Sequence, residues 1–145
     1  MVAEIRQLIQ HAPELISVMG GDLSLRSEQR LISRLSGSQL AMKESLAQKL
    51  EQLRESLSGS NPSPVDRMLV ERVVTCWLHV QFADLQLIER DDVTLKLGEY
   101  LQRQQDRAHR RFLSAVRTLT TVRRLASPIQ VDVKLSATNH HKSAQ

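Results

Sequence analysis

The fold is decided by residues 63–126, which read SPVDRMLVERVVTCWLHVQFADLQLIERDDVTLKLGEYLQRQQDRAHRRFLSAVRTLTTVRRLA. Apolar residues in both halves of this stretch recur every three or four positions, which is the period of an amphipathic helix. The polar run Arg90-Asp91-Asp92 separates the two halves. The stretch therefore predicts two long helices that fold back on each other as an antiparallel hairpin.

The first of these helices has a strong start signal. Asn61-Pro62 interrupts the preceding segment, Ser63 suits the N-cap and Pro64 suits the first helical position. Asp66 can accept hydrogen bonds from the free amides of the first turn. The apolar residues form two neighbouring stripes, which are Val65, Leu69, Val73, Cys76, Val80, Ala83 and Leu87, and then Val70, Val74, Trp77 and Ile88. Because one partner helix cannot cover so wide an arc, we expect a second contact with the N-terminal helices or another subunit.

The second helix carries apolar and basic residues on opposite sides. Thr94 can cap it, and no proline follows before Pro128. Its apolar seam consists of Leu97, Leu101, Ala108, Phe112, Ala115, Leu119, Val122 and Ala126. Five arginines fall roughly 160–180° from that seam, and they are Arg103, Arg107, Arg110, Arg117 and Arg124. Arg111 flanks this stripe, and Arg123 lies nearer the core.

The arginine stripe is the main functional signal. Between Arg103 and Arg124 the only acidic residue is Asp106, and the whole chain has a formal net charge of +4. Such a face attracts an acidic partner, and phosphate contacts require no aromatic residues. The residues predicted to bind nucleic acid are Arg103, Arg107, Arg110, Arg111, Arg117 and Arg124. The alternative is a solvated surface that serves only solubility and pairing with neighbouring acids.

The segment before the hairpin predicts shorter helices. Residues 5–19 have helical spacing, with a kink at Pro13, and Asp22 and Ser38 can cap two further helices. The inner face of the last one consists of Met42, Leu46, Leu50, Leu53 and Leu57. We expect the rest of that helix to be a solvated outer surface.

The tail changes period. Apolar and polar residues alternate over residues 129–135, which is typical of a strand, and residues 137–145 are polar. A lone strand cannot bury its apolar face, so this segment must pair with a strand from another subunit or a partner, or remain disordered. Together with the wide apolar arc, this pattern predicts a homo-oligomer. The residues predicted to mediate it are Val70, Val74, Trp77, Ile129, Val131 and Val133.

Catalysis has no signature in this chain. None of the five histidines has a recognised ligand spacing, and there is no glycine-rich phosphate loop or nucleophile elbow. His109 is expected at the surface, and Glu71 and Asp84 are expected to pair with arginines. We therefore expect no enzyme, no metal, no cofactor and no small-molecule substrate.

The cellular setting is indicated by what the sequence lacks. The single cysteine, Cys76, lies on an apolar face and is expected to be a buried thiol. No secretory leader is evident, and no apolar run approaches the roughly 18 residues that a membrane span needs. We expect a cytoplasmic protein that does not enter a membrane.

Two parts of the hairpin resemble a known group of sequences. Residues 61–78, and residues 105–113 with 121–125, resemble a family of small uncharacterised bacterial helical proteins. The order of elements is also similar to that of phage small terminase subunits, in which DNA-binding helices precede a ring-forming helical hairpin and C-terminal strands. This second resemblance implies nucleic-acid binding within a phage or mobile-element assembly, although residues 22–57 lack a clear helix-turn-helix signature.

The sequence as a whole predicts an all-α protein in three parts. Residues 1–60 form short helices, residues 61–126 form the long hairpin, and residues 127–145 form an extended, partly disordered tail. The expected function is non-catalytic binding of nucleic-acid phosphates by the arginine stripe. The alternative is a self-associating adaptor or scaffold that binds no nucleic acid.

Overall fold

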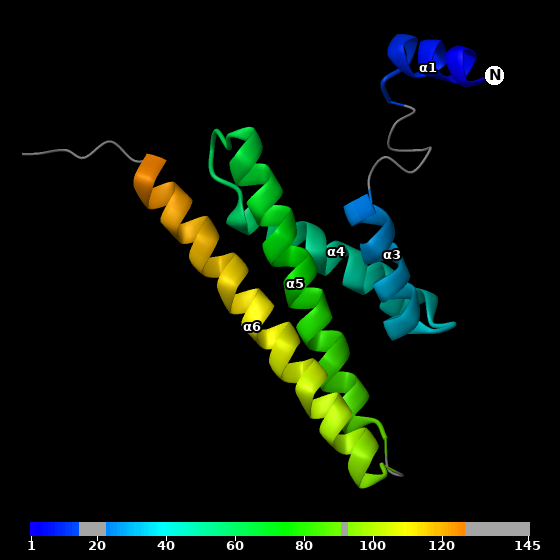
Figure 1. Cartoon of the computed structure of the whole chain (residues 1–145), viewed down its shortest axis with the longest axis vertical. Helices are drawn as coiled ribbons and strands as arrows, with labels where there is room; N and C mark the ends of the chain where they lie inside the picture. The colour runs from blue at the N-terminus through cyan, green and yellow to red at the C-terminus, as the bar shows by residue number, and fades with distance from the viewer. Residues whose placement is uncertain (15–22, 91–92, 127–145) are drawn as a thin grey trace, which may run out of the picture.

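The computed structural model describes residues 1–14, 23–90 and 93–126 of the chain. Within those ranges it contains five helices and no strand: α1 (Val2–His11), α3 (Leu23–Ser36), α4 (Leu40–Leu57), α5 (Pro64–Ile88) and α6 (Leu95–Ala126). The all-α prediction is therefore confirmed for this part of the chain (Figure 1). The expected strand at residues 129–135 and the expected cap at Asp22 lie outside the described residues.

Helices α5 and α6 form the predicted long antiparallel pair (Figure 1). Both predicted caps are present: the Ser63 Oγ accepts a hydrogen bond from the Asp66 amide at 3.1 Å, and the Thr94 Oγ1 accepts one from the Leu97 amide at 3.3 Å. The buried residues of α6 all belong to the predicted seam, and they are Leu101, Ala108, Ala115 and Leu119. Local sequence signals therefore account for both helices and for the face that each turns inward.

The ends of the pair differ from the prediction. Val65, Ile88 and Ala126 belong to the predicted apolar faces but are exposed. Arg123 of α6 contacts Asp66 in the first turn of α5, so the last residues of α6 extend beyond its partner helix. Ala126 therefore lies past the stretch of α6 that α5 covers, whereas Val65 and Ile88 are exposed in the first and last turns of α5.

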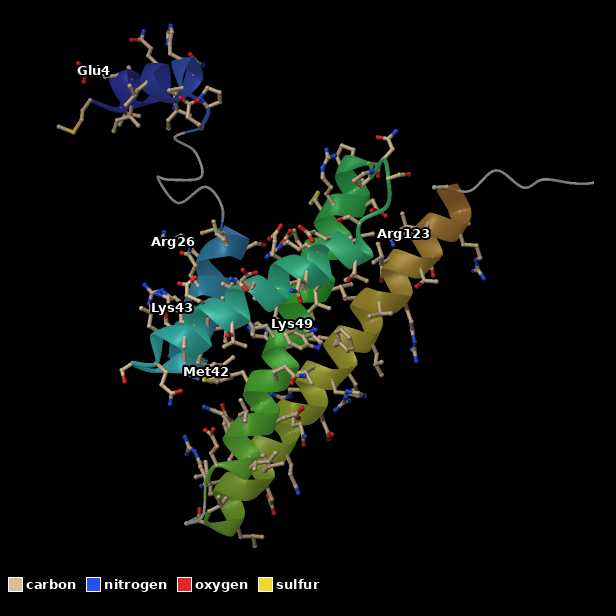
Figure 2. The ribbon with its side chains drawn as sticks, turned by 180° about the vertical axis from the view of Figure 1, so that it is seen from behind. Glu4, Arg26, Met42, Lys43, Lys49 and Arg123 are labelled. Carbon is tan, nitrogen blue, oxygen red and sulfur yellow. The ribbon has the colours of Figure 1, made fainter. Side chains whose placement is uncertain are left out.

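In the second apolar stripe of α5, Val70 and Val74 are covered by α3 and α4. Val70 is 2% exposed and Val74 is fully buried, and both share a core with Ile32 of α3 and Leu50 of α4. Figure 2 shows α4 lying across α5. The wide apolar arc was expected to contact either the N-terminal helices or another subunit, and the N-terminal helices make this contact.

Two local expectations in the N-terminal part need correction. Helix α1 does not run to a kink at Pro13 but ends at His11, because the residue before a proline is disfavoured in helical conformation and Ala12 has φ −135° and ψ 74°. Ser38 does not cap α4: its N-cap is Gln39, without a side-chain hydrogen bond, after a turn in which the Gln39 amide donates to the Ser36 carbonyl. Gly37 makes that turn possible with φ 53°.

One arginine joins three helices. Arg54 was expected on the solvated side of its helix, but its side chain is only 17% exposed and donates to Glu71 of α5 at 2.8 Å and 3.1 Å. The same guanidinium donates to Glu28 of α3, whose side chain is 7% exposed. Burial works to lower the pKa of Arg54, but the hydrogen bonds to Glu71 and Glu28 outweigh it and hold the pKa above its ordinary value.

A second polar contact joins the end of α6 to the start of α5 and the end of α4. Arg123 donates to both carboxylate oxygens of Asp66, at 2.6 Å and 2.8 Å, and to the Leu57 carbonyl at the end of α4 at 2.6 Å. Figure 2 shows Arg123 where α6 approaches the α4–α5 connection. The Asp66 carboxylate, expected to accept from helix amides, is therefore taken by an arginine from α6. This hydrogen bonding lowers the pKa of Asp66 despite the opposing effect of burial.

Candidate nucleic-acid interface

The outer side of α6 carries the predicted arginine stripe, which we name the α6 basic face: Arg103, Arg107, Arg110, Arg117 and Arg124. All five side chains are exposed, and the buried residues of α6 lie on the opposite side of the helix. At about 1.5 Å of rise per residue the stripe extends for roughly 30 Å. The packing of α6 against α5 therefore leaves the whole stripe accessible to a partner.

The contacts of these arginines decide how much of their charge is available. Arg103 lies 3.5 Å from the Glu99 carboxylate, and the two side chains are 62% and 58% exposed, so solvent screens this ion pair strongly. The Arg110 Nε donates only to the Asp106 carbonyl, at 3.3 Å. Arg107, Arg117 and Arg124 make no hydrogen bond or ion pair with any described residue. Most of the charge on the face is thus not neutralised within the described part of the protein.

Hydroxyl groups lie between two of the arginines. A shallow groove of about 290 Å³ is lined by Arg110, Ser114, Arg117, Thr118, Thr121 and Val122. The Thr118 hydroxyl donates to the Ser114 carbonyl at 2.9 Å. The hydroxyls of Ser114 and Thr121 make no hydrogen bond with any described residue, so both are available as donors. Serine and threonine hydroxyls contact phosphate oxygens in protein–DNA interfaces. These hydroxyls were not predicted from the sequence, although their spacing from the arginines follows the same helical period.

Lys96 was also missed. It is exposed in the first turn of α6 and lies seven residues before Arg103. Seven residues are close to two helical turns, so Lys96 extends the α6 basic face toward the start of the helix. The seven-residue spacing that places the arginines on one face could also have identified Lys96.

Two of the arginines near the stripe belong elsewhere. Arg111, included in the predicted nucleic-acid set, lines a cleft with Arg34 of α3 and His79 of α5. Arg123 is held by Asp66, in agreement with its expected place nearer the core. The structure thus brings five of the six predicted residues onto one face and directs the sixth to another site.

The residues predicted to mediate self-association have different placements. Val70 and Val74 are core residues of a single chain, so neither is a surface that a second copy could contact without opening the fold. Trp77 is partly buried and packs against the same core. Ile129, Val131 and Val133 lie outside the described residues. The homo-oligomer stays a prediction.

Other candidate groups have ordinary structural environments. His109 is exposed and Cys76 is buried, both as expected. Glu71 pairs with Arg54, but Asp84 accepts a hydrogen bond from Gln105 at 2.6 Å rather than from an arginine. Among the described residues, no group of three or more His, Cys, Asp or Glu side chains could hold a metal ion. The helices of the described part are all too short or too polar to cross a membrane.

Comparison with known proteins adds no relative. No protein-family model, no curated protein and no solved structure matches this chain.

Proposed function

We propose that this protein binds the phosphate backbone of nucleic acid through the α6 basic face, without catalysis. The observation that carries the proposal is the exposure of five arginines on one side of one helix, three of them without a partner among the described residues. The hydroxyls of Ser114 and Thr121 supply further donors to phosphate oxygens. A straight helix that lies along a duplex makes such contacts without reading base edges.

The expected binding is steep in salt and weak in sequence preference. Neutralising each phosphate of B-form DNA releases condensed counterions and contributes about −0.9 to the slope of log K against log salt. Five arginine contacts would therefore give a slope of roughly −4 to −5. A bare phosphate-binding face has no means of distinguishing bases, so unrelated duplexes should bind with similar affinity.

A double charge reversal tests the proposal. We expect Arg110→Glu with Arg117→Glu to abolish binding to a duplex DNA at low salt, as measured by fluorescence anisotropy. Both side chains are exposed and face away from the core, so the helical content should not change. The matched control is Arg26→Glu with Arg30→Glu, which makes the same change in net charge on exposed positions of α3, and Figure 2 shows Arg26 well away from α6. Equal loss of binding in both variants would indicate nonspecific attraction and contradict a role for α6.

A second candidate function is self-association as an adaptor, and α1 favours it. None of the residues of α1 is buried, and its apolar side chains Val2, Ile5 and Leu8 are 70%, 43% and 53% exposed. An amphipathic helix with an uncovered apolar side gains free energy by packing against a second copy. If wild-type protein fails to bind duplex DNA at low salt, this candidate replaces the first.

A further inference from the structure

A cleft between α3, α5 and α6 gathers positive charge from three separate helices. Arg34 comes from α3, His79 from α5 and Arg111 from α6, and the cleft has a volume of about 390 Å³. No aspartate or glutamate lines it, and these three side chains make no hydrogen bond or ion pair with any described residue. Elsewhere in the molecule the inward-facing arginines Arg54 and Arg123 each have carboxylate partners. The cleft therefore offers cationic groups that the described part of the protein does not itself neutralise.

The environment of His79 supports an anionic ligand. Burial lowers the pKa of this imidazole below its ordinary value, and the neighbouring charges of Arg111 and Arg72 lower it further. The charges that act on the ring are Arg111 on α6 and Arg72 on its own helix, and Arg34 on α3 lines the same cleft, so these charged groups are all of one sign. A bound anion would relieve this repulsion and favour the protonated ring, so anion binding and protonation of His79 should be linked.

The rest of the lining indicates a ligand larger than a free ion. Phe82 and Tyr100 line the cleft, and they are two of the four aromatic residues of the whole chain. Gln86 lies in the same lining and carries both a donor and an acceptor. The volume lies within the range of about 300–1,000 Å³ that is typical of sites for small organic molecules. Together, the aromatic rings, the Gln86 amide and the cationic side chains match a ligand with a planar ring, polar groups at the ring edge and a phosphate.

We propose that this cleft binds a mononucleotide or a closely similar organic phosphate. Arg34, His79 and Arg111 hold the phosphate, Phe82 and Tyr100 contact the base, and Gln86 hydrogen-bonds an edge of the ring. The site adds a small-molecule ligand where the sequence predicts no small-molecule substrate. It uses Arg111 and none of the α6 basic face, so it stands independently of the proposed binding of nucleic acid.

Calorimetry with three probes tests the chemistry. AMP carries both ring and phosphate, adenosine lacks the phosphate and inorganic phosphate lacks the ring. We expect AMP to bind at least ten-fold more tightly than either fragment, because only AMP engages both ends of the cleft. Adenosine binding as tightly as AMP would overturn the role of the cationic end. Inorganic phosphate binding as tightly as AMP would overturn the role of the ring contacts.

Variants locate the site. Arg34→Gln and Arg111→Gln should each weaken AMP at least ten-fold, and both positions are exposed, so their folding can be verified by circular dichroism. Arg117→Gln is the matched control on the α6 basic face and should bind AMP like the wild type. AMP binding that is lost in the Arg110→Glu, Arg117→Glu variant but kept in Arg111→Gln would place the nucleotide on the basic face and overturn the proposal.

The histidine ring gives a readout that does not depend on affinity. Saturating AMP should raise the apparent pKa of His79 followed by NMR, with the signal assigned by its loss in His79→Asn. The ring signal of His109, which is exposed elsewhere on α6, should not respond to AMP. A response at His109 without one at His79, or no binding of AMP at millimolar concentration, would contradict the proposed site.

Discussion

At the scale of single residues, charged side chains of this protein have two different uses. Arg54 and Arg123 are turned inward, where each joins helices that are far apart in the sequence. The arginines of the α6 basic face are turned outward and mostly lack carboxylate partners among the described residues. Composition alone cannot distinguish these two uses. A buried arginine and an exposed arginine look the same in the sequence until the neighbouring residues from other helices are known.

Asp66 gives the first prediction at this scale. Its hydrogen bonds with Arg123 lower its pKa from the ordinary value of 3.8, so its ionised form favours the folded state. This contribution is fully present above the unfolded-state pKa and is lost as the pH falls through the lower folded-state pKa. Asp66→Asn should therefore lower the melting temperature at pH 6, and the difference from wild type should narrow below about pH 4.

The difference between the two proteins is the quantity to measure. The pKa of His79 is also lowered from its ordinary value of 6.5. Protonation of His79 therefore destabilises the folded state of the wild type and of Asp66→Asn alike once the pH falls below that value. Subtracting the melting temperature of the variant from that of the wild type at each pH removes this shared effect. A difference in melting temperature that stays constant from pH 6 to pH 3 would mean that the carboxylate of Asp66 does not stabilise the fold through its charge.

At the scale of helices, the parts of the fold that the sequence predicts are those encoded locally. Ser63 and Thr94 act on amides only three residues away, and the seam of α6 follows from a repeat within one helix. The parts that it does not predict depend on distant residues. The Arg54–Glu71 pair spans 17 positions and the Arg123–Asp66 pair spans 57, so no local pattern selects either partner.

The candidate site follows the same division. Five arginines of the α6 basic face could be predicted because a single helical repeat places them together. Arg111 could not be assigned from α6 alone, because its surroundings are made by Arg34 and His79 of two other helices. The cleft forms where three helices meet, so no local sequence motif predicts it.

Leu119 gives the prediction at this scale. It is 5% exposed in the core between α5 and α6, so Leu119→Ala should cost about 2–5 kcal/mol in the free energy of unfolding, measured by urea titration. Leu125, on the same helix, is 76% exposed, and Leu125→Ala should change the free energy by less than about 0.5 kcal/mol. Similar losses in both variants would mean that the face of α6 that packs on α5 is misassigned.

At the scale of the whole molecule, four of the five helices that the structure describes build the core, and the fifth, α1, contributes no buried residue to it. The core residues come from α3, α4, α5 and α6, while α1 has no buried residue. Figure 1 shows α1 apart from the other helices. Stability and self-association can therefore reside in different parts of the chain, because the apolar side of α1 is not needed to complete the core.

Removal of residues 1–11 separates these two properties. We expect the truncated protein to unfold at the same urea concentration as the full chain, since no buried contact is lost. If α1 pairs with a second copy, the molar mass from light scattering at micromolar concentration should fall for the truncated protein, whereas the full chain associates. The point variant Leu8→Glu should lower the mass in the same way, because it places a charge on the apolar side of α1 without shortening the chain. A loss of stability on truncation would show that α1 packs on the core, and an unchanged mass would assign any self-association to another surface.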